Sequence, residues 1–337
     1  MVFHDIVLEE EKHEVRQFLE QFKLYYEDDI DETIVIRENG KIIATASTSH
    51  NIIKCIAIDP NHQGRNLLAT LMTEMIKRLA LKEITHYFVY TKDDQADLFK
   101  SLGLKKIVQT IDVALLEGGD TITHKLKNLK ETYQLSNKPK AAIVVNANPM
   151  TKGHYHLIET VSKEHQEVLV FVVSEERSIF PFEARLNIVK EACQSLENVI
   201  VVPTLDYLVS YATFPKYFMK NESKIREEHA LIDVLIFKEY YMKIFNIQER
   251  YVGEEPLSPM TAMYNQTMKK YLNNRFHIIP RKTLNNTPIS ASTVRKLLRK
   301  NGLEAVKPYV TTSTYQYLLS DQGKEIIEKL KTHDDRH

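Results

Sequence analysis

The sequence predicts an α/β protein built from two domains. With 337 residues the chain is longer than one hydrophobic core usually serves. Short apolar runs alternate with amphipathic segments along most of its length, an order typical of sheets covered by helices. The polar stretch at residues 136–140, read SNKPK, has the composition of a linker. We therefore expect one domain over residues 1–135 and a second over residues 136–337.

The first domain is expected to be an α/β unit of several strands and helices. Glu38-Asn39-Gly40 between two apolar runs is a hairpin signal, and Gly103 ends a short helix. The predicted helices cover residues 10–24, a segment that begins near Leu67, residues 96–102 and a polar connector at 121–135. The predicted strands cover residues 33–37, 41–45, 51–58, 87–90 and one long strand at 105–116.

The stretches AIDPNHQGRNLLATLM and LFKSLGLKK resemble the GNAT acetyltransferase family over about the first 117 residues. In that family the turn after the strand holds the pyrophosphate of acetyl-CoA on backbone amides. Gln63 and Gly64 are present here, but Asn66 and Leu68 stand where small residues are expected. Side chains there oppose close approach of the backbone to a phosphate. We therefore expect a GNAT-like fold used for support or docking, without acetyl-CoA as acetyl donor.

The second domain reads as a Rossmann-like parallel sheet. Its strands are short apolar runs, and buried parallel strands have this composition. They are predicted at residues 141–145, 167–173, 198–202, 234–237 and 276–279, with helices after His154 and at 182–196. In such sheets ligands bind beyond the carboxyl ends of the strands.

Composition excludes several classes of protein. Lys+Arg and Asp+Glu both total 45, so the formal charge is zero and no overall basic field for nucleic acid exists. Cys55 and Cys193 are far apart and form no disulfide or metal-ligand pattern. No apolar run approaches the roughly 20 residues that span a membrane. We expect a soluble cytoplasmic protein.

The loop that follows the first strand of this second domain contains residues suited to bind phosphate. Asn146, Asn148 and Pro149 break the strand, and Thr151, Gly153 and His154 open the next helix. A helix N-terminus attracts phosphate, glycine permits close approach, and a histidine can donate to an oxygen that gains charge. The loop resembles the signature of the HxGH nucleotidyltransferases, with Thr151 in place of the initial histidine.

A second phosphate-binding pattern lies near the other end of the chain. Ser290, Ser292, Thr293 and Arg295 belong to the stretch ISASTVR, which resembles the ISSTxxR motif of the same superfamily. Hydroxyls at a helix start can cap it, and an arginine fork suits phosphate. By themselves these residues also fit an ordinary capped helix.

Three further segments make the resemblance specific. They are ERSIFPFEAR at 176–185, ATFPKYF at 212–218 and RYVGEEP at 250–256, the last followed by Thr261 and Tyr264-Asn265. Together with NANPMTKGH they resemble the [citrate (pro-3S)-lyase] ligase family, which joins a GNAT-like domain to a nucleotidyltransferase domain. The resemblance covers essentially the whole chain.

The resemblance implies a reaction and its partners. The family uses ATP, with Mg²⁺ as the expected metal, to activate acetate as acetyl-adenylate. It then acetylates the prosthetic-group thiol of the citrate lyase acyl carrier protein and releases AMP. The resemblance assigns the α-phosphate to His154, phosphate contacts to Thr151, and the outer phosphates to Ser290, Ser292, Thr293 and Arg295. It leaves the metal ligands unknown, although Glu254 and Glu255 are candidates.

Several residues are open between a functional and a structural role. Lys152, Arg177 and Arg185 are candidate phosphate or acetate contacts. The two arginines could equally form surface ion pairs with nearby glutamates, and Lys152 could be a solvated surface lysine. The aromatic residues of 207–218 could line an acyl pocket, although core packing is the commoner use of such side chains.

Two other functions remain open from the sequence. One is an adenylyltransferase acting on a phosphorylated cofactor precursor, which the two nucleotide motifs alone would allow. The other is a non-catalytic adaptor that binds an acyl carrier protein through the GNAT-like domain. Acetate-dependent pyrophosphate exchange distinguishes the first of these alternatives from the ligase, and failure to bind ATP would favour the second.

Overall fold

The computed structural model describes residues 2–176, 178–208, 217, 221–254 and 259–332. Contacts divide the chain into two compact units. The first comprises Met1–Lys125 together with Pro215–Ile232, and the second comprises Leu126–Phe214 with Asp233–His337. Each unit is an α/β fold, as the sequence predicts. No helix among the described residues is long and apolar enough to cross a membrane.

The first unit contains a seven-stranded mixed sheet with the order β1-β2-β3-β4-β5-β7-β6. All neighbours are antiparallel except β4 and β5. Its strands are β1 (Phe3–Asp5), β2 (Glu32–Glu38), β3 (Lys41–Ser49), β4 (Ile52–Ile58), β5 (Tyr87–Lys92), β6 (Lys105–Gln109) and β7 (Val113–Gly118). The helices of this part of the chain are α1 (Glu9–Glu20), α2 (Leu67–Leu81), α3 (Ala96–Ser101) and α4 (Ile122–Thr132).

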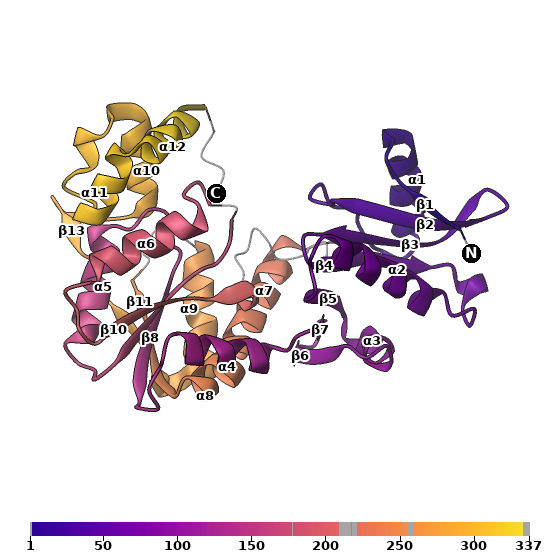
Figure 1. Ribbon diagram of the computed structural model, residues 1–337, viewed down its shortest axis with the longest axis horizontal. Coiled ribbons are helices and arrows are strands. Elements are labelled where there is room, and N and C mark those ends of the chain that lie inside the picture. The colour runs from indigo at the N-terminus through magenta and orange to yellow at the C-terminus, as the bar shows by residue number, and fades with distance from the viewer. Residues whose placement is uncertain (1, 177, 209–216, 218–220, 255–258, 333–337) are drawn as a thin grey trace. The chain divides into compact units, whose positions relative to one another are not determined.

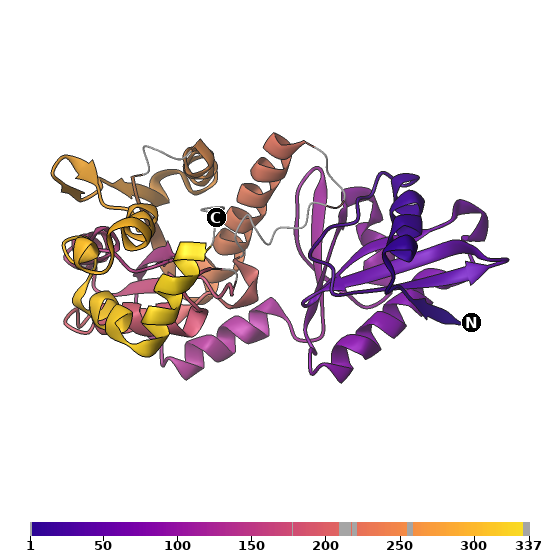
Figure 2. The same cartoon turned by 90° about the horizontal axis from the view of Figure 1, so that it is seen from above.

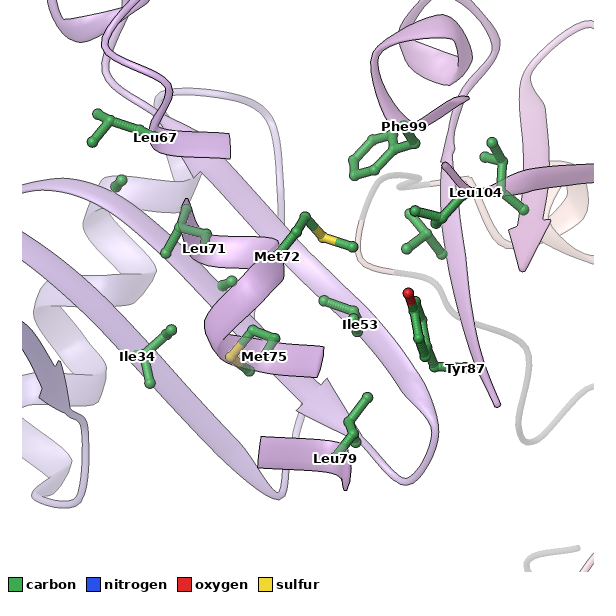
Figure 3. Packing of buried hydrophobic residues seen from close by; sticks show 14 of the residues in the cluster. Ile34, Ile53, Leu67, Leu71, Met72, Met75, Leu79, Tyr87, Phe99 and Leu104 are labelled. Carbon is green, nitrogen blue, oxygen red and sulfur yellow. The ribbon is translucent and has the colours of Figure 1, made fainter. Parts of the chain in front are cut away.

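The core of this sheet forms against α2. The buried residues Leu67, Leu71, Met75 and Leu79 recur at spacings of four residues, so they share one face of the helix. Figure 3 shows this face packed onto strand residues such as Ile34 and Ile53. The apolar spacing read from the sequence therefore identifies the helix face that is buried.

The expected long strand at 105–116 is wrong, because the segment folds back on itself. Thr110 N–H donates to the Val113 carbonyl at 2.8 Å, and the Thr110 hydroxyl accepts from Val113 N–H at 3.0 Å. This turn makes β6 and β7 an antiparallel pair. The turn was hard to recognise because it contains no Gly, Pro or Asn, and Gln109, Thr110 and Asp112 were its only polar signals.

A segment from the middle of the chain completes the first unit. Tyr217 is buried, its hydroxyl donates to the Tyr90 carbonyl, and its own carbonyl accepts from Tyr25 N–H at 2.7 Å. Farther along, Thr110 donates to Glu228 at 2.5 Å and Lys224 pairs with Asp112 at 2.8 Å. The boundary proposed at residue 136 did not anticipate this later contribution to the N-terminal unit.

The second unit contains a five-stranded parallel sheet with the order β10-β9-β8-β11-β12. The strands are β8 (Lys140–Val145), β9 (Val168–Val172), β10 (Val199–Pro203), β11 (Ile247–Gly253) and β12 (Phe276–Ile279). A small hairpin, β13 (Thr283–Leu284) and β14 (Thr287–Pro288), precedes the last helices. The Rossmann-like parallel sheet is thus confirmed.

Helices cover both faces of this sheet (Figures 1 and 2). On one face α5 (Lys152–Ser162) and α6 (Phe182–Ala192) pack on Ile143 and Val170. On the other face Phe171 meets the aromatic rings of Phe237, Tyr241 and Phe245. The remaining helices are α7 (Glu222–Ile236), α8 (Met242–Ile244), α9 (Pro259–Leu272), α10 (Ala291–Asn301), α11 (Thr312–Leu319) and α12 (Asp321–Thr332), with a π-helical turn over Phe237–Tyr241.

Two strand assignments in this unit differ from expectation. Residues 234–237, predicted as a strand, lie at the end of α7 and the start of the π-helical turn. The interior strand β11 was not predicted, because Glu249 and Arg250 interrupt its apolar pattern. A four-residue apolar run fits either a strand or a buried helix, and only the tertiary packing distinguishes them.

We expect Tyr217→Phe to lower the free energy of unfolding by about 1–3 kcal/mol. The change removes the hydroxyl that donates to the buried Tyr90 carbonyl, and removal of one partner of a buried hydrogen bond costs about that much. Urea denaturation of the full chain would measure the loss. Tyr271→Phe, at a partly exposed tyrosine of α9, is the matched control, and equal effects of the two changes would contradict the prediction.

Candidate functional site

The loop from Asn146 to Thr151 lies at the carboxyl end of β8, where α5 begins. Thr151 is the N-cap of α5, and its hydroxyl accepts from His154 N–H at 3.3 Å. In return, Thr151 N–H donates to His154 Nδ1 at 3.1 Å. These reciprocal bonds fix the imidazole relative to the helix start.

The same bonds define the tautomer of His154. Because Nδ1 accepts a hydrogen bond from Thr151 N–H, the ring proton of the neutral imidazole lies on Nε2. Burial, together with the positive charge of Arg281, lowers the pKa of His154 to about 4. At neutral pH the side chain is therefore an uncharged donor, which can serve an anion without being a cation itself.

The second motif stands at the start of α10 and has the same kind of cap. Ser290 is its N-cap and accepts from Thr293 N–H at 3.0 Å. The Ser290 hydroxyl also lies 2.9 Å from that of Ser292 and 2.7 Å from that of Thr293. Three hydroxyls are thus gathered at one helix N-terminus, where the backbone dipole favours a bound anion.

The two motifs meet in the folded chain. Arg295 Nη1 donates to the carbonyl of Asn148 at 2.6 Å, across 147 residues of sequence. A Cβ atom on Gly153 would lie only 3.0 Å from the Ile289 carbonyl, so the close approach of the two loops favours glycine. Two helix N-termini and one arginine therefore border the same region.

Residues near the C-terminus also form hydrogen bonds with the His154 loop. Lys152 N–H donates to the Tyr309 carbonyl at 2.8 Å, and Thr314 donates to the Met150 carbonyl at 2.8 Å. Thr151 also forms an isolated bridge with Val310. The Lys152 ammonium donates to the Lys307 carbonyl at 3.4 Å. This contact with the protein gives no support to the phosphate role considered for Lys152.

Arg185 has a different role from the one considered from the sequence. Its side chain is fully buried and donates to the backbone carbonyls of Phe180, Asn146, Val173 and Glu175. Since all three guanidinium nitrogens serve protein acceptors, Arg185 holds the loops after β8 and β9 together. These partners are neither the ligand nor the surface ion pair that were considered for Arg185 from the sequence.

The asparagines of the loop are also held by protein partners. Asn146 accepts from Arg185 at 2.8 Å and contacts Ser178 at 3.1 Å through its amide nitrogen. Asn148 is buried, accepts from Phe180 N–H at 3.1 Å, and precedes Pro149 through a cis peptide bond. These contacts order the loop on which Thr151 and His154 stand.

The remaining candidates divide between core, surface and undescribed residues. Tyr207 is buried, as the packing alternative expects. Glu254 is exposed and donates its N–H to the Ile279 carbonyl. Arg177, Glu255 and the rest of the aromatic segment apart from Tyr217 lie outside the described residues.

Arg281 was not predicted as a site residue, although its positive charge contributes to the lowered pKa of His154. It follows β12 and precedes the small hairpin, in the stretch PRKTLNN. A basic pair between a strand and the ISAST motif was a visible signal. Its nearness to His154, however, depends on the order of strands in the sheet.

The described residues contain no group of three or more His, Cys, Asp or Glu side chains suited to hold a metal ion. Mg²⁺ in nucleotide sites is bound largely by phosphate oxygens and water, with one or two carboxylates. The described side chains thus identify no metal ligands, and no chemical step is assigned to a metal here.

Comparison with known proteins assigns this chain to a family. Residues 140–318 match the family model for the citrate lyase ligase C-terminal domain, and residues 2–104 match the acetyltransferase (GNAT) family. The match to the second model agrees with the resemblance seen in the N-terminal sequence.

Full-length relatives agree with these matches. The chain is 35% identical to a [citrate [pro-3S]-lyase] ligase of Escherichia coli, over 90% of this chain and 89% of that protein. It is 34% identical to one of Haemophilus influenzae, over 94% and 98% of the two chains. A phosphopantetheine adenylyltransferase of Streptococcus gordonii is 44% identical over 63 residues, which are 18% of this chain and 38% of that protein. The chain therefore belongs to the citrate lyase ligase family.

Proposed function

We propose that this protein is a [citrate (pro-3S)-lyase] ligase that uses ATP to acetylate the acyl carrier protein of citrate lyase. The meeting of the His154 loop with the Ser290–Arg295 motif carries the proposal, because it joins two phosphate-binding helix starts. Family membership supports the acyl carrier protein as the partner and ATP as the cosubstrate. The thiol on its prosthetic group is the acceptor that we propose.

The reaction has two balanced steps. A carboxylate oxygen of acetate attacks the α-phosphorus of ATP, and the bond to pyrophosphate breaks, which leaves acetyl-adenylate. The carrier thiolate then attacks the acetyl carbon, and AMP leaves with the bonding electron pair. Acetate needs the first step because its carboxylate lacks a good leaving group, and the thiolate is the nucleophile of the second.

The chain's own residues act by positioning and charge stabilisation. His154 Nε2–H donates to an α-phosphate oxygen as negative charge increases there. Ser290, Ser292, Thr293 and Arg295 bind the β- and γ-phosphates, while Gly153 lets the α5 amides approach. Thr151 orients His154, and Asn146, Asn148 and Pro149 shape the loop that faces ATP. Lys152, Arg177 and Arg281 add positive charge, and a Mg²⁺ ion bound to the triphosphate would offset part of its negative charge.

The two sequence domains proposed at 1–135 and 136–337 have separate tasks in this scheme. The C-terminal part carries both phosphate motifs and performs the adenylation. In the GNAT-like part, Glu38 pairs with Arg65 at 2.9 Å and with His62 at 2.8 Å, beside the turn that holds a phosphate in acetyltransferases. These pairings support a docking or supporting role for this part.

Acetate-dependent exchange of labelled pyrophosphate into ATP tests the proposal with purified protein. Exchange that requires acetate supports the ligase. Exchange that requires a phosphate ester such as phosphopantetheine would instead favour an adenylyltransferase, the activity named for the relatives that match a short stretch of this chain. Failure to bind ATP would leave the adaptor function.

His154→Ala should lower kcat for acetate-dependent exchange by about 10²–10³, the usual cost of one preorganised donor to a developing negative charge. ATP affinity should change little, because the bond matters most in the transition state. His156→Ala, on the same helix, is the matched control. A large loss of ATP affinity with unchanged kcat would assign His154 to ground-state binding instead.

The depressed pKa of His154 predicts a pH dependence of stability. The unfolded imidazole takes up a proton near pH 6.5, whereas the folded one resists protonation until about pH 4. Stability present above pH 6.5 is therefore lost as the pH falls towards 4. Urea denaturation from pH 8 to 4.5 should show a smaller acid loss for His154→Gln than for the wild type, and identical curves would contradict this reasoning.

Arg295→Lys should lower kcat/KM for ATP by at least about tenfold. Lysine keeps the charge but cannot contact the Asn148 carbonyl and a phosphate with one planar fork. Arg299→Lys, one turn later on α10, is the control and should leave ATP use nearly unchanged. Near-normal kinetics of Arg295→Lys would reduce Arg295 to a point charge.

A further inference from the structure

Helix α10 concentrates positive charge in a chain that is neutral as a whole. Its sequence ASTVRKLLRKN contains four basic residues and no acidic one. Helix α12, which packs with α10 around one apolar cluster, contains three lysines and three acidic residues (Figure 1). The excess of positive charge is therefore a property of α10 rather than of the C-terminal helices in general.

The basic residues of α10 share the side of the helix that faces away from the core. Val294 and Leu298 are buried in the apolar cluster. Lys296 and Lys300 are both exposed, and their spacing of four residues places them on one face. Arg299 stands beside them, three residues after Lys296. We call Lys296, Arg299 and Lys300 the basic face of α10.

The two lysines of this face differ from those of α12. Neither Lys296 nor Lys300 forms an ion pair with another residue that the structure describes. On α12, by contrast, Lys324 and Lys331 each pair with a carboxylate of the same helix, at 2.9 and 2.6 Å. Positive charge that is not balanced by neighbouring carboxylates creates a field that an acidic surface complements.

Neither ATP nor the helix dipole accounts for the whole basic face. The phosphates are proposed to bind at the first turn of α10, and Lys300 lies about 12 Å beyond Ser292 along the helix axis. Basic residues in a last turn stabilise a helix through its dipole, which applies to Arg299 and Lys300. Lys296 stands in the middle of α10, where the dipole contributes little.

The basic face begins beside the proposed adenylation centre. Ser292 lies one turn before Lys296 on the same side of α10, and Arg295 donates to the Asn148 carbonyl of the His154 loop at 2.6 Å. A protein bound to Lys296 and Lys300 would therefore lie within about 6–12 Å of the phosphate-binding turn, measured along the helix. It could present a thiol to an acyl-adenylate formed there.

We propose that the basic face of α10 binds an acidic face of the acyl carrier protein. This inference rests on the proposed function, which supplies the carrier as partner, and it adds the docking surface and the sign of the partner's charge. A protein is favoured over nucleic acid, because the chain as a whole carries no net positive charge. Charge complementarity mainly speeds encounter and fixes orientation.

The test compares two double variants of the full chain that have the same change in charge. Lys296→Glu with Lys300→Glu reverses the basic face, and Lys324→Glu with Lys331→Glu on α12 is the matched control. In carrier acetylation, followed by AMP release, the first variant should raise KM for the purified carrier at least about tenfold and the control should change it little. Acetate-dependent pyrophosphate exchange, which needs no carrier, should be unchanged in both.

Salt and conservative variants separate charge from an effect on folding. Between about 50 and about 500 mM NaCl, KM for the carrier should rise at least about tenfold in the wild type and far less in the charge-reversed variant, because salt screens exposed charges. Lys296→Arg with Lys300→Arg keeps both charges and should keep the wild-type KM. If the charge-reversed variant does not fold, Lys296→Gln with Lys300→Gln takes its place, because glutamine also favours helix.

Two results would overturn the docking surface directly. One is a wild-type KM and salt dependence in the charge-reversed variant, and the other is an equal loss in the α12 control. Tighter binding of random-sequence duplex DNA than of the carrier, lost in the charge-reversed variant, would also overturn it and assign the basic face to nucleic acid.

Calorimetric titration of the carrier into the full chain separates this proposal from the proposed function. Carrier binding that depends on Lys296 and Lys300, in a protein without acetate-dependent exchange, would retain the docking surface and reject the ligase reaction. Acetate-dependent exchange, together with carrier binding that is insensitive to both lysines, would retain the ligase and reject the docking surface.

Discussion

The reciprocal hydrogen bonds between Thr151 and His154 are the contact on which the proposed chemistry depends. They cap α5, and they also fix the imidazole with its proton on Nε2. A histidine used in this way gains its donor role from backbone geometry rather than from charge. Thr151 in place of a histidine is therefore consistent with a site that relies on one neutral donor and on nearby arginines.

The loop that carries this pair is held from three directions. Arg185 joins it to the loop after β9, Arg295 joins it to the start of α10, and Thr314 anchors Met150 to α11. Each bond ends on a backbone carbonyl, so it constrains the main chain rather than one rotamer. Such support preorganises the loop and spares the reaction the cost of ordering it.

The two buried arginines of the second unit differ in how fully their donors are hydrogen-bonded. Arg185 lies among carbonyl oxygens, and its burial is offset by hydrogen bonds. Arg250 lies among aromatic rings, and two of its nitrogens have no hydrogen-bond partner among the described residues. The same residue type at similar burial therefore has different consequences, because the surrounding acceptors differ.

Much of the fold could be predicted from the sequence, since apolar periodicity reports local structure. The α2 face, the hairpin at Asn39-Gly40 and the parallel strands β8 to β10 all follow from spacing and turn residues. The segment at 234–237 could not be assigned in this way, because four apolar residues suit a buried helix as well as a strand. At β11 the charged Glu249 and Arg250 concealed an interior strand.

The sequence by itself determined the family and the two motifs proposed to bind phosphate, because each motif is a short run whose chemistry is local. Only the tertiary structure decided which other side chains belong with them. In the folded chain, Arg185 holds two loops together and Arg281 lies near His154. Arg250, Asp233 and Tyr264 lie together on one face of the sheet. These outcomes depend on strand order and on the acceptors near each buried charge, which residue spacing does not encode.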